Sequence, residues 1–325
     1  MPVTLKSNDS LRDHLTNFHL TDKAVGESAS SSDNYARYTP SKEQMTKIME
    51  LVENRTGLKF GKRDLRFFFI TREEATKLAT DEFSSILAEL RLDKNTFNSL
   101  LKEVMNTELK NYKISPGHYS RLTKRVYCMP ENLEMAVKRR SVEFVQAGVI
   151  QGKLHGILRK EADERALSRT TEFEVANTLA HEYAHKILHE NNLVVDKEAL
   201  RLRLQLYRLA SKLKGADKKE EEKIFKSIKQ INKNIDAIDV FDEAVAYLVE
   251  YRVMRDLGFD KEVSFYLKNL MLQNLDIAKG IAFLEQIESI ANRNPIPLIY
   301  KNLPESMLEI ENPRAYLRRT TGWRV

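Results

Sequence analysis

The sequence predicts an α+β fold that is predominantly helical, with a small mixed sheet, an inserted helical hairpin and a helical C-terminal part. Apolar residues recur every three or four positions through most of the 325 residues, which is the period of an amphipathic helix. Strand-like runs are short and few, and the clearest are DLRFFFI at 64–70 and RVYCMP at 125–130. The hydrophobic fraction of 42% is sufficient for a substantial core.

Composition shifts divide the chain into four segments. The first is Ser-rich and polar, as in GESASSSDNYARY, and is expected to be a flexible lead-in. Pro and Gly at Ser115-Pro116-Gly117 mark the end of the next segment as a turn. The predicted division is a flexible N-terminal segment 1–40, a mixed N-terminal subdomain 41–115, a central domain 116–260 with a helical hairpin inserted at 197–239, and a helical C-terminal subdomain 261–325.

The inserted hairpin is predicted from two apolar stripes that are separated by Gly215-Ala216-Asp217. Each stripe has helical spacing, and the remaining positions are highly charged, which is typical of two antiparallel helices with a solvated outer face. A scaffold that packs on the core is the favoured role, and a substrate gate or partner arm is the alternative. The stripes are Leu202, Leu206, Leu209 and Leu213, and then Ile224, Ile228, Ile231 and Ile235.

Charge and cysteine usage limit the class of protein. A single cysteine, Cys128, excludes an internal disulfide and a Cys-rich zinc ribbon, and it fits a reducing compartment. No stretch approaches 18 apolar residues and no signal peptide is recognised, so we expect a cytoplasmic protein without a membrane span. The net charge of +6 is a weak indication of anionic partners. Nucleic acid is the less favoured partner, because the basic groups at 138–140 and 318–324 are hardly interleaved with aromatic residues.

The run NTLAHEYAHKILHE at 177–190 contains His181, Glu182 and His185, a His-Glu-x-x-His motif. At this His and acid content, chance would write such a motif in roughly two of a hundred sequences. Thr171 with Glu174 predicts a capping box that starts a helix, and that helix is expected to run until Asn191. Its apolar stripe consists of Phe173, Ala176, Leu179, Ala180, Tyr183, Ala184, Ile187 and Leu188.

On such a helix the two histidines can share one metal ion. They lie one turn apart, about 6 Å along the axis, so both imidazoles can approach the same point. Glu182 is offset around the helix, where it could take a proton from a metal-bound water. The alternative is a charged helix whose histidines are only hydrogen-bonded.

A catalytic zinc ion needs a third protein ligand and one open position. His189 would stand about 12 Å along the axis from His181, too far to share the ion, so we expect it to be a packing or outer residue. The run VFDEAVAYLVEYRVMRDLG at 240–258 predicts a second buried helix, with Glu243 at its start and small alanines after it. Glu243 is the favoured ligand and Glu250, two turns on, is the reserve candidate. A carboxylate that stabilises a helix start is the other interpretation of Glu243.

His181-Glu182-Tyr183-Ala184-His185 followed by Glu243-Ala244-Val245-Ala246-Tyr247 resembles the zincin superfamily of metallopeptidases, and within it the gluzincin branch. The spacing His-x-x-x-His that continues to His189 is also similar to the ImmA/IrrE-like intracellular peptidases, whose gap to the glutamate is shorter. The resemblance implies a zincin-like catalytic domain in which His181, His185 and Glu243 bind Zn²⁺ and Glu182 is the general base. Ala244 departs from the glycine that many relatives carry. A protein or peptide substrate follows from the same resemblance.

The run VIQGKLHGILRK at 149–160 precedes the metal helix and resembles the edge strand to which zincins add an extended peptide. Gly152 and Gly156 would leave room for a second backbone, and His155 could face the cleft. The alternative is an ordinary strand that two glycines weaken. Gluzincins often stabilise the oxyanion with a tyrosine or histidine from a later region, so Tyr300 is a candidate catalytic residue and Tyr266 is the other.

Two functions follow. The first is a zinc-dependent metallopeptidase that hydrolyses peptide bonds through a zinc-activated water with Glu182 as general base. The second is a non-catalytic or regulatory zinc-binding protein that acts through protein or nucleic-acid contacts. A structural zinc site has no need of Glu182, so the motif favours catalysis. Hydrolysis of a non-peptide amide or ester by the same site is a third, weaker option.

Overall fold

The structure is a computed structural model that describes residues 35–321 except 62, 90–91, 112–114, 157–158, 194–195, 214–215 and 293. Residues 40–325 form one compact unit, and the residues before them belong to a separate N-terminal unit. The latter contributes only a short 3₁₀ turn at 35–38 to the described residues. The predicted flexible segment up to residue 34, and the basic tail after residue 321, lie outside the described residues.

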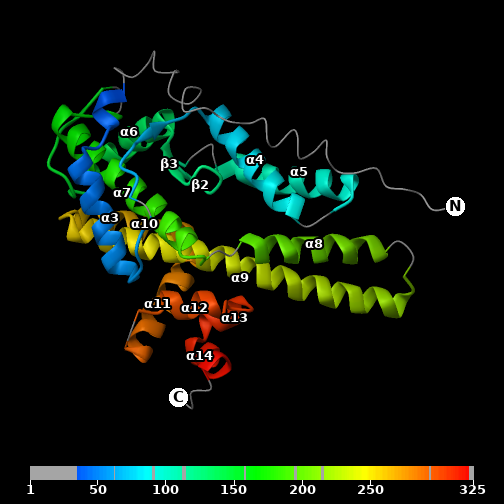
Figure 1. Ribbon diagram of the computed structural model, residues 1–325. Coiled ribbons are helices and arrows are strands. Elements are labelled where there is room, and N and C mark those ends of the chain that lie inside the picture. The colour runs from blue at the N-terminus through cyan, green and yellow to red at the C-terminus, as the bar shows by residue number, and fades with distance from the viewer. Residues whose placement is uncertain are drawn as a thin grey trace. The chain divides into compact units, whose positions relative to one another are not determined.

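The described chain is predominantly helical with two small sheets, which confirms the predicted α+β, mainly helical class (Figure 1). No helix in the described ranges is both long and apolar enough to cross a bilayer. The helices are α3 (Lys42–Thr56), α4 (Arg72–Glu89), α5 (Lys94–Asn111), α6 (Pro130–Gln146), α7 (Glu164–Glu190), α8 (Asp196–Lys212), α9 (Lys218–Asp256), α10 (Asp260–Gln273), α11 (Leu275–Ala291), α12 (Ile296–Lys301), α13 (Met307–Glu311) and α14 (Pro313–Thr321).

The larger sheet has three strands in the order β1-β3-β2, so β2 (Gly117–Ser120) is an edge strand. β3 (Arg125–Cys128) pairs in parallel with β1 (Phe68–Phe69) and antiparallel with β2. Of the strands predicted at 64–70 and 125–130, residues 68–69 and 125–128 form strands, and these lie side by side. A separate two-stranded antiparallel sheet joins β4 (Leu154–His155) to β5 (Glu161–Ala162).

Helix α7 carries the His-Glu-x-x-His motif and begins earlier than predicted. Asp163 is its N-cap, and the side chain of Asp163 accepts a hydrogen bond from the backbone N–H of Ala166. Thr171 is inside the helix, where its hydroxyl donates to the carbonyl of Leu167. The predicted capping box at 171–174 is thus wrong, because the preceding residues 164–170 contain no Gly or Pro to break the helix.

Helix α9 is one continuous helix of 39 residues, although the sequence predicted a hairpin helix followed by a separate metal-ligand helix. The apolar positions of the hairpin stripe continue without a Gly or Pro through Ile235, Ile238 and Phe241 into Val245. Glu243 therefore lies in the middle of α9. Its predicted place at a helix start, and stabilisation there by the helix dipole, do not apply.

The motif helix α7 and helix α9 pack directly on each other. The small residues Ala180 and Ala184 on α7 are fully buried. On its far side α9 packs on α11, where a Cβ at Gly280 would lie 2.6 Å from the Cβ of Ala244. The rigid α7–α9 pair is what brings the two predicted metal-binding blocks together.

The helical hairpin consists of α8 and the first half of α9, which lie alongside each other (Figure 1). Its root is an apolar cluster that also receives residues of the C-terminal part. The buried members are Ala199, Leu202, Ile235 and Ile238, with Leu206, Ile231, Tyr300 and Leu303 packed against them. The hairpin is therefore joined to the C-terminal helices at its base.

Candidate metal centre

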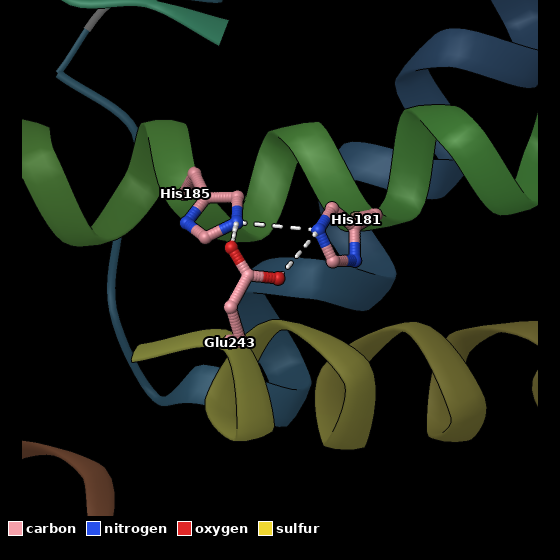
Figure 2. Close-up of side chains that lie close together, drawn as sticks. All are labelled: His181, His185 and Glu243. Carbon is pink, nitrogen blue, oxygen red and sulfur yellow. Dashed lines mark hydrogen bonds and ion pairs between the residues drawn. The ribbon is translucent and has the colours of Figure 1, made fainter. Parts of the chain in front are cut away.

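Three side chains from α7 and α9 converge on one point (Figure 2). The Nε2 atoms of His181 and His185 are 3.2 Å apart. Glu243 reaches them from α9, with one carboxylate oxygen 3.6 Å from Nε2 of His181 and the other 3.8 Å from Nε2 of His185. One potential ligand atom of each residue lies within 4.8 Å of the other two.

The donor set suits a zinc ion. Two imidazole nitrogens and one carboxylate oxygen are ligand types that zinc accepts, and three protein ligands leave one position open. The histidine side chains are 16% exposed and that of Glu243 is 48% exposed, so the cluster is open to solvent on the α9 side. The structure thus places the predicted ligands where they could hold one ion.

A carboxylate is hydrogen-bonded to His181 from behind, and a second carboxylate lies behind His185. Nδ1 of His181 lies 2.9 Å from Glu250, whose side chain is almost fully buried, and Nδ1 of His185 lies 3.6 Å from Asp242. Such outer carboxylates fix the tautomer and the ring orientation of metal-binding histidines, with the Nε2 lone pair toward the metal. The structure places Glu250, the reserve ligand, on the far edge of His181 from the cluster, where it can orient the ring and not share the ion.

The pKa values of His181 and His185 are shifted in opposite directions. Burial lowers the pKa of His181, but the hydrogen bond and charge of Glu250 outweigh it and raise that pKa to about 9. Burial and the nearby charge of His181 lower the pKa of His185 well below its usual value. A metal ion bound between the rings would displace the proton that His181 holds, so metal binding is expected to release protons.

Glu182 stands beside the cluster and is not one of the three converging ligands. Its side chain is buried, and burial raises the pKa of its carboxyl to about 7, while the charge of His181 lowers it and that of Glu243 raises it. The backbone N–H of Tyr119, on the edge strand β2, donates to the Glu182 carboxylate. A carboxyl group with a pKa near neutrality is suited to accept and return a proton.

Strand β2 packs on α7 at the motif, a neighbour that the sequence did not reveal. Gly117 permits this approach, because a Cβ at that position would lie 2.5 Å from Cγ2 of Thr178 and 2.8 Å from Cγ of Glu182. The glycine in Ser115-Pro116-Gly117 was interpreted only as part of a turn. The contact instead makes β2 the strand that borders the candidate site.

Gly117→Ala is expected to lower the free energy of unfolding by about 1–3 kcal/mol, because β2 or α7 must shift to admit the methyl group. The matched control is Gly61→Ala, where the nearest atom would be 3.8 Å from the new Cβ. Chemical denaturation of both variants measures the difference. Equal stabilities would contradict the close packing of β2 on Glu182.

The strand predicted at 149–160 is not at the site, which corrects the assignment of Gly152, His155 and Gly156 to substrate binding. Only Leu154–His155 form a strand, and β4 pairs with β5 just before α7 begins. The motif lies about 27 Å farther along α7, at 1.5 Å per residue. A Cβ at Gly152 would meet Ala166, and Gly156 adopts a positive φ of 78° between the two strands.

Of the two tyrosines predicted for the oxyanion, Tyr300 faces Asp242 and Tyr266 is hydrogen-bonded to Tyr247. The Tyr300 hydroxyl donates to Oδ1 of Asp242 at 2.7 Å, behind the His185 ring and away from the Nε2 atoms. The Tyr266 ring is covered by the guanidinium of Arg140 at 4.4 Å. The Tyr300 hydroxyl therefore lies behind the cluster and not beside the Nε2 atoms. His189 contacts β2 through the Tyr119 hydroxyl at 2.9 Å, as expected of an outer residue.

Tyr247 is the aromatic residue next to the cluster that sequence reasoning did not single out. Its ring centroid is 4.8 Å from that of His181, and it follows Glu243 by one turn on the same face of α9. Burial raises the pKa of its hydroxyl, and the charges of Glu243 and Glu250 raise it further. The four-residue spacing between Glu243 and Tyr247 was the sequence feature that could have identified Tyr247 as a neighbour of the site.

The sequence matches no known protein family and no curated protein. The fold is similar to a crystal structure from Chloroflexus aurantiacus, of a protein described as a candidate hydrolase with a novel fold. The two share 14% identity with a TM-score of 0.50, and the match covers 86% of this chain and 92% of that one. At this identity the likeness concerns the fold.

Proposed function

We propose that the protein is a zinc-dependent hydrolase, and that its substrates are peptide bonds. The observation that carries this proposal is the pairing of three convergent donor atoms with a separate buried carboxyl group, Glu182. A purely structural or regulatory zinc site would use the three ligands and leave Glu182 without a role. The description of the structural neighbour as a hydrolase agrees with this class of reaction.

Peptide hydrolysis and a zincin-like fold are supported by the resemblance of the two motif blocks to gluzincins. The placement of both histidines and Glu243 on two packed helices agrees with that resemblance. In this chain Glu243 lies in mid-helix and β2 borders the site. A cytoplasmic place of action remains a prediction from the single cysteine.

In the proposed mechanism the zinc ion and the protein side chains have separate chemical roles. A zinc ion at the cluster would lower the pKa of a water molecule toward about 7 and polarise the scissile carbonyl group. Glu182 takes the proton of the attacking water and returns it to the leaving nitrogen. Glu250 and Asp242 keep His181 and His185 oriented during both steps.

Strand β2 is the proposed binding edge for an extended substrate. Gly117 and Cys128 are opposite each other in the antiparallel pair, and the N–H of Met129 donates to the carbonyl of Pro116. In this register the backbone groups of Gly117 and Tyr119 point away from β3. The N–H of Tyr119 donates to Glu182 and the carbonyl of Gly117 accepts from the Ser115 hydroxyl. A peptide that adds to β2 through the N–H of Gly117 and the carbonyl of Tyr119 would pass the side chain of Glu182.

Tyr247 is the proposed hydrogen-bond donor to the oxyanion in place of Tyr300. Tyr247→Phe is expected to lower kcat by about 10²-fold with little change in KM, as loss of one such donor does. The zinc content of the variant should equal that of the wild type. A metal-loaded Tyr247→Phe protein with full kcat would remove Tyr247 from the mechanism.

The test of the function is cleavage of a peptide library followed by mass spectrometry. We expect cleavage by the zinc-loaded protein, its loss on chelation, and its return when zinc is added back. A zinc-loaded protein that cleaves no peptide but hydrolyses small amides or esters would keep the hydrolase class and exclude peptides as substrates. No hydrolysis of any of these substrates would favour the regulatory alternative.

A further inference from the structure

The C-terminal helices reach the candidate metal site through one side chain. Tyr300, on the short helix α12, donates its hydroxyl to Oδ1 of Asp242 at 2.7 Å. The other oxygen of the same carboxylate faces Nδ1 of His185 at 3.6 Å. A chain of polar contacts therefore runs from α12 through α9 to the metal-binding edge of α7.

The ring of Tyr300 is itself held in place. Its centroid is 5.1 Å from that of Phe241, and it packs on the apolar cluster at the root of the helical hairpin, beside Leu202 and Ile238. Asp242 is only 17% exposed, so few water molecules can replace the hydroxyl as its partner. The rotamer of Asp242 is thus set by a residue 58 positions away in sequence.

The two histidines differ in what holds their outer carboxylate. Glu250 contacts His181 at 2.9 Å, and its second partner is Asn177, on the same helix as the histidine. Asp242 stands farther from His185, and its second partner belongs to the C-terminal part of the chain. The carboxylate behind His185 therefore has its partner on α12, whereas the partners of Glu250 are on α7.

We propose that Tyr300 is a positioning residue that sets the zinc affinity of the cluster by orienting Asp242 against His185. This inference rests on the proposed zinc site. A carboxylate whose rotamer is fixed keeps the proton on Nδ1 of His185 and leaves the Nε2 lone pair directed at the ion. Without the hydroxyl, the Asp242 side chain can rotate away and His185 loses that constraint.

The experiment compares the zinc affinity of Tyr300→Phe with that of wild type by competition with a chromophoric chelator. Tyr316→Phe is the matched control, because Tyr316 is also a buried C-terminal tyrosine, whose hydroxyl donates to the carbonyl of Asn302 at 2.8 Å. We expect about a 10-fold or greater loss of zinc affinity in Tyr300→Phe, as for other outer partners of metal ligands. Tyr316→Phe should keep the wild-type affinity, even if both variants melt at a lower temperature.

A second comparison tests whether Tyr300 acts on zinc binding through Asp242. In an Asp242→Asn background, Tyr300→Phe should weaken zinc binding by less than about twofold, because contacts in one network are not additive. Equal zinc affinities of wild type and Tyr300→Phe would overturn the inference. So would a loss of zinc affinity from Tyr300→Phe in the Asp242→Asn background as large as the loss in the wild-type background. A wild-type protein that binds no zinc would instead overturn the proposed site itself, so the two failures are distinguishable.

Discussion

Glu182→Gln is expected to retain zinc and to lose turnover, with kcat falling by a factor on the order of 10²–10⁴. Glutamine has the same length and fills the same buried space beside the cluster, but it cannot accept the proton of the attacking water. The loss corresponds to about 3–5 kcal/mol in the activation free energy. Steady-state kinetics on a peptide identified in the library, together with the zinc content of the variant, measure the effect.

Glu172→Gln is the matched control for Glu182→Gln. Glu172 lies on the same helix, its side chain is 56% exposed, and its nearest cationic partner is Arg169 at 3.8 Å. We expect wild-type kcat from this variant, since an exposed ion pair of this kind contributes little. Full turnover by zinc-loaded Glu182→Gln would exclude Glu182 as the general base.

Glu243→Ala is expected to abolish tight zinc binding, whereas Glu250→Gln should weaken it by about 10–100-fold. Glu243 faces both Nε2 atoms and supplies a ligand, and its removal leaves only two protein ligands. Glu250 contacts Nδ1 of His181, so its amide variant still fills the space but no longer fixes the ring as strongly. Chelator competition measures both affinities on one scale.

The order of these two effects separates the two acidic candidates on α9. A larger loss of affinity in Glu250→Gln than in Glu243→Ala would make Glu250 the ligand and Glu243 an exposed bystander. Both proteins must first show the helical content of the wild type by circular dichroism. This control matters more for Glu250, whose side chain is buried next to Asn177.

The sequence predicted the parts of the site that depend on local spacing. His181, Glu182 and His185 share one helix, so their relative placement follows from the helical repeat alone. Glu243 could be chosen because it has an acidic side chain on a buried helix with small neighbours. The starts of both helices were predicted wrongly, since Asp163 and the continuity of α9 through Ile235 were weaker signals than the apparent cap and turn, whereas the predicted end of α7 at Asn191 is correct.

The remainder of the site depends on contacts between distant parts of the chain. Strand β2 borders Glu182 because of sheet pairing with β3 and the missing Cβ of Gly117, and no periodicity in the sequence reports such a contact. The glycines at 152 and 156 gave the same sequence signal, but Gly152 packs against Val145 and Ala166 and Gly156 follows β4 with a positive φ. Tyr300 was selected for the right neighbourhood, but only the fold shows that its hydroxyl faces Asp242.

The metal content of the purified protein, measured by elemental mass spectrometry, bears most directly on the proposed function. The proposed site predicts one zinc ion per chain in the wild type and none in His185→Ala. A wild-type protein without metal, which also takes up none when zinc is added, would contradict it and leave His181 and His185 as hydrogen-bonded residues of a charged helix.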